Sequence, residues 1–149
     1  MLKNSIIELF ERDLLRLKDE INLYTDESKL WITKKDITNS AGNLALHLLG
    51  NLNHFIGAIL GNNGYIRKRE QEFSNKNIPR DEILKGINKT IEVIKSVLAE
   101  ITDEEMQKNY PVEVFKNKGK MKVQFFLIHL SGHLNYHLGQ INYHRRLIG

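Results

Sequence analysis

The 149-residue chain contains no cysteine and only two prolines. The absence of cysteine excludes disulfide bonds, thiolate metal sites and a protein thiol that acts as a nucleophile. The scarcity of proline leaves long helices uninterrupted. No apolar run approaches the roughly 20 residues that cross a membrane, and the charged N-terminal segment lacks the apolar stretch of a signal peptide. We therefore expect a cytoplasmic protein with no membrane partner.

The chain also lacks a large excess of charge of one sign. The chain has 22 basic and 18 acidic residues, a net charge of +4, and its basic residues are spread out with small clusters at 116–122 and 145–146. Nucleic-acid-binding proteins usually carry a denser basic stripe, so nucleic acid is not an expected partner. The length and the hydrophobic fraction of 41% suffice for a buried core. We expect a single domain over residues 1–149.

Four segments place apolar residues at steps of three and four, the pattern of amphipathic helices. They cover about residues 3–23, 40–60, 80–98 and 123–147. The charged residues 67–73 are expected to form a surface connection with some helical character. The connections 24–39 and 101–121 are long enough for helices to cross over. The pattern predicts an all-α fold, a four-helix bundle with long crossover connections.

Six histidines stand in the two segments 40–60 and 123–147: His47, His54, His129, His133, His137 and His144. Three of them, His129, His133 and His137, recur every four residues, so each differs from the next by only about 40° around the helix. Apolar residues such as Leu130 and Leu134 share that side, which predicts that the stripe faces the interior. Buried imidazoles need partners.

A divalent metal ion is the economical partner, since two histidines four residues apart can both reach an ion at about 2.0–2.1 Å. The third ligand must come from another helix. His47 lies on the apolar stripe of the second segment, and His54 is the alternative. A three-histidine site leaves a position open, as in catalytic metal sites. The competing interpretation is a set of hydrogen-bonded core histidines. His144 is expected at the surface or at the helix end.

Polar neighbours could support such a site. Asn43 and Asn51 flank His47 by four residues on either side, and either could accept a hydrogen bond from an imidazole N–H. Gln140 could orient a ligand or a bound water, or simply lie in a helix interface. Arg67 and Arg69 could meet an anionic substrate, or belong to a solvated face.

Two segments, SAGNLALHLLGNL at 40–52 and HLSGHLNYHLGQI at 129–141, resemble the DinB superfamily, in particular its DUF1572-like branch. The pattern Arg-x-Arg-x-x-Glu-Phe at 67–73 resembles the same branch. The resemblance implies a DinB/YfiT-like four-helix bundle, often with crossed connections, and a homodimer. It also implies that His47, His133 and His137 hold the metal, while His129 supports a ligand or faces the substrate.

The resemblance extends to chemistry. Similar proteins include bacillithiol S-transferases and a mycothiol-dependent maleylpyruvate isomerase, in which zinc or nickel is thought to bind the thiolate of a small cofactor. It implies a metal-dependent transferase that uses a low-molecular-weight thiol on a small-molecule substrate. Three imidazoles also suit copper and iron. Two alternatives are a metal-dependent hydrolase and a non-catalytic dimeric bundle that binds a metal or a ligand.

Overall fold

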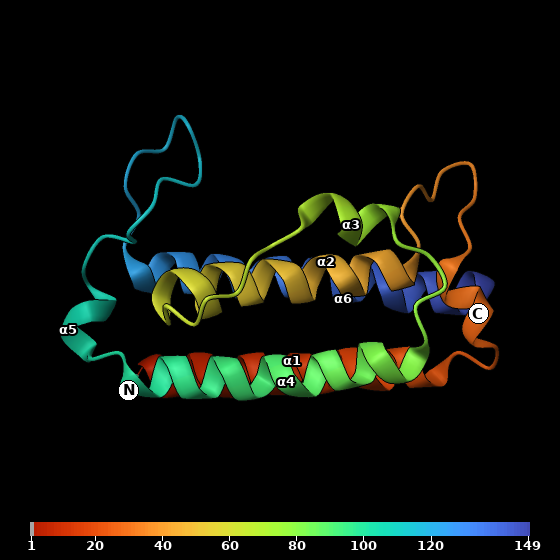
Figure 1. Ribbon diagram of the computed structural model, residues 1–149, viewed down its shortest axis with the longest axis horizontal. Helices are drawn as coiled ribbons and strands as arrows, with labels where there is room; N and C mark the ends of the chain where they lie inside the picture. Colours follow the sequence, from red (N-terminus) through yellow and green to blue (C-terminus); the bar gives the residue numbers. More distant parts are fainter. Residues whose placement is uncertain (1) are drawn as a thin grey trace.

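The computed structural model describes residues 2–149, and helices dominate that part of the chain (Figure 1). The long helices are α1 (Leu2–Leu23), α2 (Ala41–Leu52), α4 (Arg80–Glu100) and α6 (Val123–Ile148). The shorter elements are η1 (Glu27–Trp31, a 3₁₀ turn), η2 (Asn53–Leu60, π-helical), α3 (Arg69–Ser74) and α5 (Asp103–Met106). Residues 2–149 contain no β-strand, which confirms the predicted all-α class.

Local sequence signals explain where these helices begin. The side chain of Ser40 accepts a hydrogen bond from the backbone N–H of Asn43 and so caps α2. Thr102 and Glu105 form a reciprocal capping box at the start of α5. Pro79 precedes α4, whose first turn is acidic, as suits the positive end of the helix dipole. The starts of α2 and α5 therefore follow from their own capping residues.

The four long helices lie in two layers, with α1 beside α4 and α2 beside α6 (Figure 1). α1 and α6 run in one direction, and α2 and α4 in the other. All four contribute fully buried side chains to one core, among them Phe10, Leu17, Leu48, Ile87 and Leu134. Burial of these apolar faces is the main contribution to the stability of the fold.

The connection over residues 61–79 runs the length of the molecule. Because α2 and α4 run parallel, this segment returns along the length of α2 and carries α3 across its outer face (Figure 1). We expected the connections 24–39 and 101–121 to be long enough for helices to cross over. Each of them passes from one layer to the other at an end of the molecule, from α1 to α2 and from α4 to α6 (Figure 1).

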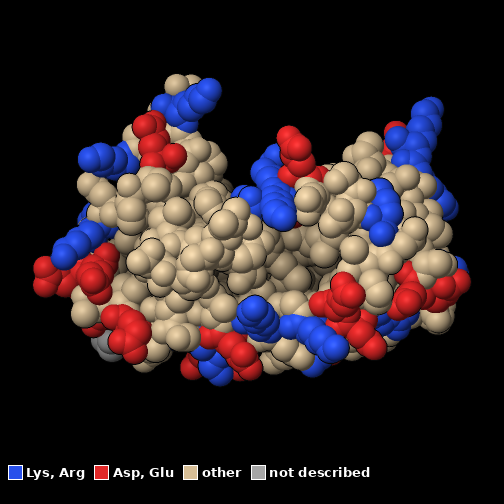
Figure 2. Space-filling model, in the orientation of Figure 1, with Lys and Arg blue, Asp and Glu red and all other residues tan. Residues whose placement is uncertain are grey.

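Within residues 2–149, no helix combines the length and the apolar character needed to span a membrane. On the face shown in Figure 2, acidic and basic side chains are interspersed around a largely uncharged area. The basic residues do not gather there into the dense stripe that is typical of nucleic-acid-binding surfaces.

Candidate metal centre

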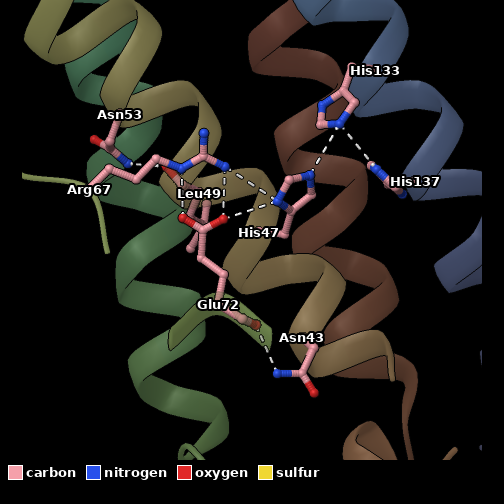
Figure 3. A network of polar contacts seen from close by, with 8 residues as sticks. All are labelled: Asn43, His47, Leu49, Asn53, Arg67, Glu72, His133 and His137. Carbon is pink, nitrogen blue, oxygen red and sulfur yellow. Dashed lines mark hydrogen bonds and ion pairs between the residues drawn. The ribbon is translucent and has the colours of Figure 1, made fainter. Parts of the chain in front are cut away.

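Three imidazoles from two helices converge where α2 packs against α6 (Figure 3). The Nε2 atom of His133 lies 3.2 Å from Nε2 of His47 and 3.1 Å from Nε2 of His137. One ligand atom from each of the three residues lies within 4.8 Å of the others. Two nitrogens bound to one ion at about 2.0–2.1 Å with a near-tetrahedral angle are about 3.3–3.4 Å apart. The observed spacing is close to that of ligands that share an ion.

The cluster lies at the edge of the core rather than within it. His47 is buried, with 7% of its surface exposed, whereas His133 and His137 are half-buried and His129 is exposed. The prediction that the whole stripe of α6 faces the interior was therefore wrong for His129. A site in this position is reachable by a small molecule.

The second ring nitrogen of His47 is held by Glu72 of α3. Nδ1 of His47 lies 3.0 Å from Oε1 of Glu72, and a carboxylate only accepts, so Nδ1 is the donor (Figure 3). A neutral His47 then carries its lone pair on Nε2, toward the other two imidazoles. A hydrogen-bonded carboxylate of this kind orients a metal-binding histidine and raises its basicity.

Arg67 holds Glu72 in turn. Its Nε and Nη2 atoms each donate to one carboxylate oxygen at 2.8 Å, a bidentate pair (Figure 3). Burial opposes ionisation of Glu72, but the hydrogen bonds from Arg67 and His47 outweigh it and hold the pKa of this carboxyl below its usual range. Glu72 is thus a buried anion whose charge Arg67 balances.

α2 is shaped to receive this carboxylate. A Cβ atom at Gly50 would lie 1.9 Å from Oε2 of Glu72, so only glycine leaves room for the side chain. About two helical turns before Gly50, Nδ2 of Asn43 donates to the backbone carbonyls of Glu72 and Asn75, each at 2.8 Å. Asn43 therefore ties α3 to α2 and does not bond an imidazole.

Gln140 bonds Nδ1 of His137 in the same way as Glu72 bonds Nδ1 of His47. Its Oε1 lies 2.7 Å from Nδ1 of His137, which therefore donates and keeps its lone pair on Nε2. Burial, followed by the neighbouring imidazoles, lowers the pKa of His133 to about 4, and burial also lowers the pKa of His137. Both rings are therefore neutral near neutral pH, as metal ligands must be.

The proton count of the cluster favours a cation. Nε2 of His133 faces two lone pairs and can donate one proton to only one of them, while its buried Nδ1 has no hydrogen-bond partner among residues 2–149. One acceptor nitrogen is therefore always left over. A divalent ion would accept all three lone pairs, so this donor set fits a metal.

A pocket of about 370 Å³ adjoins the cluster and is lined by His47 and His133. Two of the predicted neighbours lie here. The ring of His129 is stacked on Phe126, with centroids 5.8 Å apart, and the buried Oδ1 of Asn51 has no hydrogen-bond partner in the described part of the chain. Neither residue bonds a ring nitrogen of the cluster.

The remaining two histidines lie elsewhere. His54 packs its ring against Phe55, with centroids 4.8 Å apart, outside the cluster. His144 is only 3% exposed: its Nδ1 lies 2.6 Å from the hydroxyl of Tyr24, and its Nε2 donates to the carbonyl of Ile32 at 2.8 Å. The prediction of a surface or capping role for His144 was wrong, because the 24–39 connection covers it.

Sequence reasoning missed Glu72 and its partner role. Residues 67–73 were expected to form a surface connection, but Glu72 is 6% exposed and contacts two elements of the site. The available signal was the resemblance of the Arg-x-Arg-x-x-Glu-Phe pattern itself. Opposite charges five residues apart do not otherwise distinguish a buried pair from a solvated one.

Comparison with known proteins identifies one family. No curated protein matches the chain. The model of the family described as "Protein of unknown function (DUF1572)" matches residues 3–149. This match covers both helices that carry the three histidines and the connection that carries Glu72. The chain therefore belongs to the DUF1572 family.

Proposed function

We propose that His47, His133 and His137 hold one divalent metal ion, zinc or nickel, and that the protein is a metal-dependent thiol S-transferase. The observation that supports the metal is the convergence of three Nε2 atoms, with separations of 3.1 and 3.2 Å from His133 to its two neighbours. When bound, such an ion lowers the pKa of a thiol and positions its sulfur. The chain has no cysteine, so the thiol would be a small molecule.

The protein's own residues prepare this chemistry. Glu72 and Gln140 keep the Nδ1 protons of His47 and His137 in place and so aim both lone pairs at one point. Arg67 neutralises the buried carboxylate of Glu72. The adjoining pocket supplies room for the thiol and its electrophilic partner beside the imidazoles.

The same proposal includes the wider setting. We propose a single cytoplasmic domain of the DinB superfamily, with the DinB/YfiT-like four-helix arrangement, that assembles as a homodimer. Support for the dimer comes from exposed large apolar residues along α6: Phe125, Ile128, Tyr136, Tyr143 and Leu147. A stripe of this kind commonly marks an interaction site. Sedimentation equilibrium should give twice the chain mass, and a monomer at high concentration would contradict the dimer.

Metal content tests the ligand set directly. Elemental analysis of the purified, dialysed protein should give one zinc or nickel per chain. The variant His47→Ala should lose the metal, because two imidazoles of one helix hold it poorly without the third. The variant His54→Ala is the matched control, since it removes an imidazole seven residues away that lies outside the cluster. Stoichiometric metal in His47→Ala would contradict the assignment.

Activity tests the reaction class. With N-acetylcysteine as the thiol and monochlorobimane as the electrophile, the metal-bound protein should accelerate thioether formation, and His133→Ala should abolish the acceleration. Ester cleavage without added thiol would favour the hydrolase instead. A metal-bound protein that catalyses neither reaction would favour the non-catalytic binding bundle.

A further inference from the structure

The lining of the pocket beside the imidazoles extends along α2, η2 and α6. On the α2 side its lining proceeds in four-residue steps from His47 through Asn51 to Phe55. On α6, which runs in the opposite direction, it proceeds from His133 back to Phe126. At 1.5 Å per residue, the two ends are roughly 12 Å apart. One end therefore carries the metal-binding groups and the other end carries phenyl rings.

The apolar lining of the pocket comes from three different segments. The rings of Phe55 and Phe126 meet edge to face, with centroids 5.1 Å apart. Val114 and Phe115, from the connection between α5 and α6, also line the pocket, and the ring of Phe115 meets that of His129 edge to face, with centroids 5.1 Å apart. Such a wall favours an aromatic or branched apolar group on the ligand.

The charge of the pocket has one sign. None of its lining residues is acidic, whereas Arg67 and Arg69 both line it. Arg67 is neutralised by Glu72. Arg69 is exposed and has no ion-pair or hydrogen-bond partner among residues 2–149. Its guanidinium lies over the ring of Phe73, 5.5 Å from the centroid, so an uncompensated positive charge stands beside the groove.

Phe73 locates that charge relative to the imidazoles. Its ring centroid is 5.0 Å from that of His47, so Arg69 is held on the metal-binding side of the pocket. Asn51, which also lines the pocket, is 7% exposed, and none of residues 2–149 gives its Oδ1 a hydrogen bond. A buried acceptor without a partner is costly, and a donor group of a ligand or a water would satisfy it.

We propose that this pocket binds an organic anion with an aromatic or branched apolar body. The anionic group lies against Arg69, and the body lies along Phe55, Phe115 and Phe126. This inference deepens the proposed function, because it names the substrate class of the same site and rests on a metal beside the pocket for any reaction. The volume of about 370 Å³ is at the lower end of the range for small-molecule pockets.

Calorimetric titration with three matched probes tests the proposal. The probes are 3-phenylpropionate, which has both features, 3-phenylpropanol, which lacks the charge, and propionate, which lacks the ring. We expect 3-phenylpropionate to bind about tenfold more tightly than either of the others, since each feature contributes independently. The variant Phe55→Ala should weaken binding of both phenyl compounds to a similar degree.

The variant Arg69→Gln should weaken 3-phenylpropionate by about fivefold, the scale of a charge-assisted contact at a partly exposed site, and leave 3-phenylpropanol unchanged. The matched control is Lys68→Gln, which removes an exposed neighbouring charge that does not line this pocket. Equal binding of acid and alcohol, or equal effects of the two variants, would overturn the proposal. So would the absence of 3-phenylpropionate binding.

Each titration is run on chelator-treated and on metal-replenished protein, so that the two proposals fail separately. Should elemental analysis find no metal, the proposed function falls, while the dependence on Arg69 and Phe55 is still measured in the metal-free protein. Binding that requires the metal but ignores Arg69 would overturn the anion site and leave the metal site standing.

Discussion

Replacing Gly50 with alanine tests whether the Glu72 carboxylate supports the proposed metal ligands. A Cβ atom at position 50 would lie 1.9 Å from Oε2 of Glu72 and 2.5 Å from its Cδ, far inside van der Waals contact. α2 is anchored in the core at Leu48 and Leu52, both fully buried, so the carboxylate is the group that moves. Its bonds to Arg67 and to Nδ1 of His47 are then lost.

The expected losses can be weighed. Removing the hydrogen-bonded partner of a metal-binding histidine typically lowers metal affinity by about 10–100-fold. For the metal-free protein, alanine in a helix interior adds about 0.5–1 kcal/mol to the free energy of unfolding. Breaking a buried ion pair removes about 3–5 kcal/mol when one charge stays buried. The second effect is larger, so Gly50→Ala should destabilise the fold by about 2 kcal/mol or more.

Zinc titration against a competing chelator measures the affinity, and urea unfolding of the metal-free protein measures the stability. The matched control is Gly132→Ala. This glycine is exposed on α6 next to His133, and a Cβ atom there would meet nothing within 4 Å. It should gain about 0.5–1 kcal/mol and bind zinc as the wild type does. Wild-type affinity in Gly50→Ala, or an equal loss in Gly132→Ala, would refute the reasoning.

Three further predictions concern the fold. Between pH 6.5 and about 4, the unfolded chain binds a proton at His133 that the folded metal-free protein excludes, so the free energy of unfolding falls as the pH falls. Urea unfolding should show a smaller pH dependence of this free energy in His133→Leu, and the same dependence as in the wild type would contradict the prediction. Tyr24→Phe removes the hydroxyl 2.6 Å from Nδ1 of His144 and should cost about 1–2 kcal/mol by urea unfolding, with metal content unaffected. Leu48→Ala, at a fully buried position of α2, should cost about 2–5 kcal/mol; a change below that range would indicate a looser core.

The helices themselves could be predicted because each buries one apolar face. Phe10, Leu14 and Leu17 of α1 are buried, and the steps of four and three between them are visible in the sequence. The path of the chain could not be predicted this way. Whether two helices run parallel depends on how their faces pack, so the lengthwise course of 61–79 became apparent only in the structure.

The candidate site could likewise be predicted only in part. Spacing placed His133 and His137 on one face, and the family resemblance selected His47 as their partner. Glu72 was not predicted, because its burial depends on a missing side chain at Gly50 and on the bidentate contact with Arg67. Neither condition produces a periodic pattern in the sequence. His144 likewise carries no local sign of the Tyr24 hydroxyl that meets it across 120 residues.

The 61–79 segment can be changed separately from the helices that form the core. The long helices provide the three imidazoles and Gln140, whereas Glu72, Arg67 and Arg69 all belong to the 61–79 segment. Grafting a different 61–79 segment onto the same helices would therefore alter the basicity of His47 and the charge beside the pocket together. The chemistry could be retuned in this way without rebuilding the core.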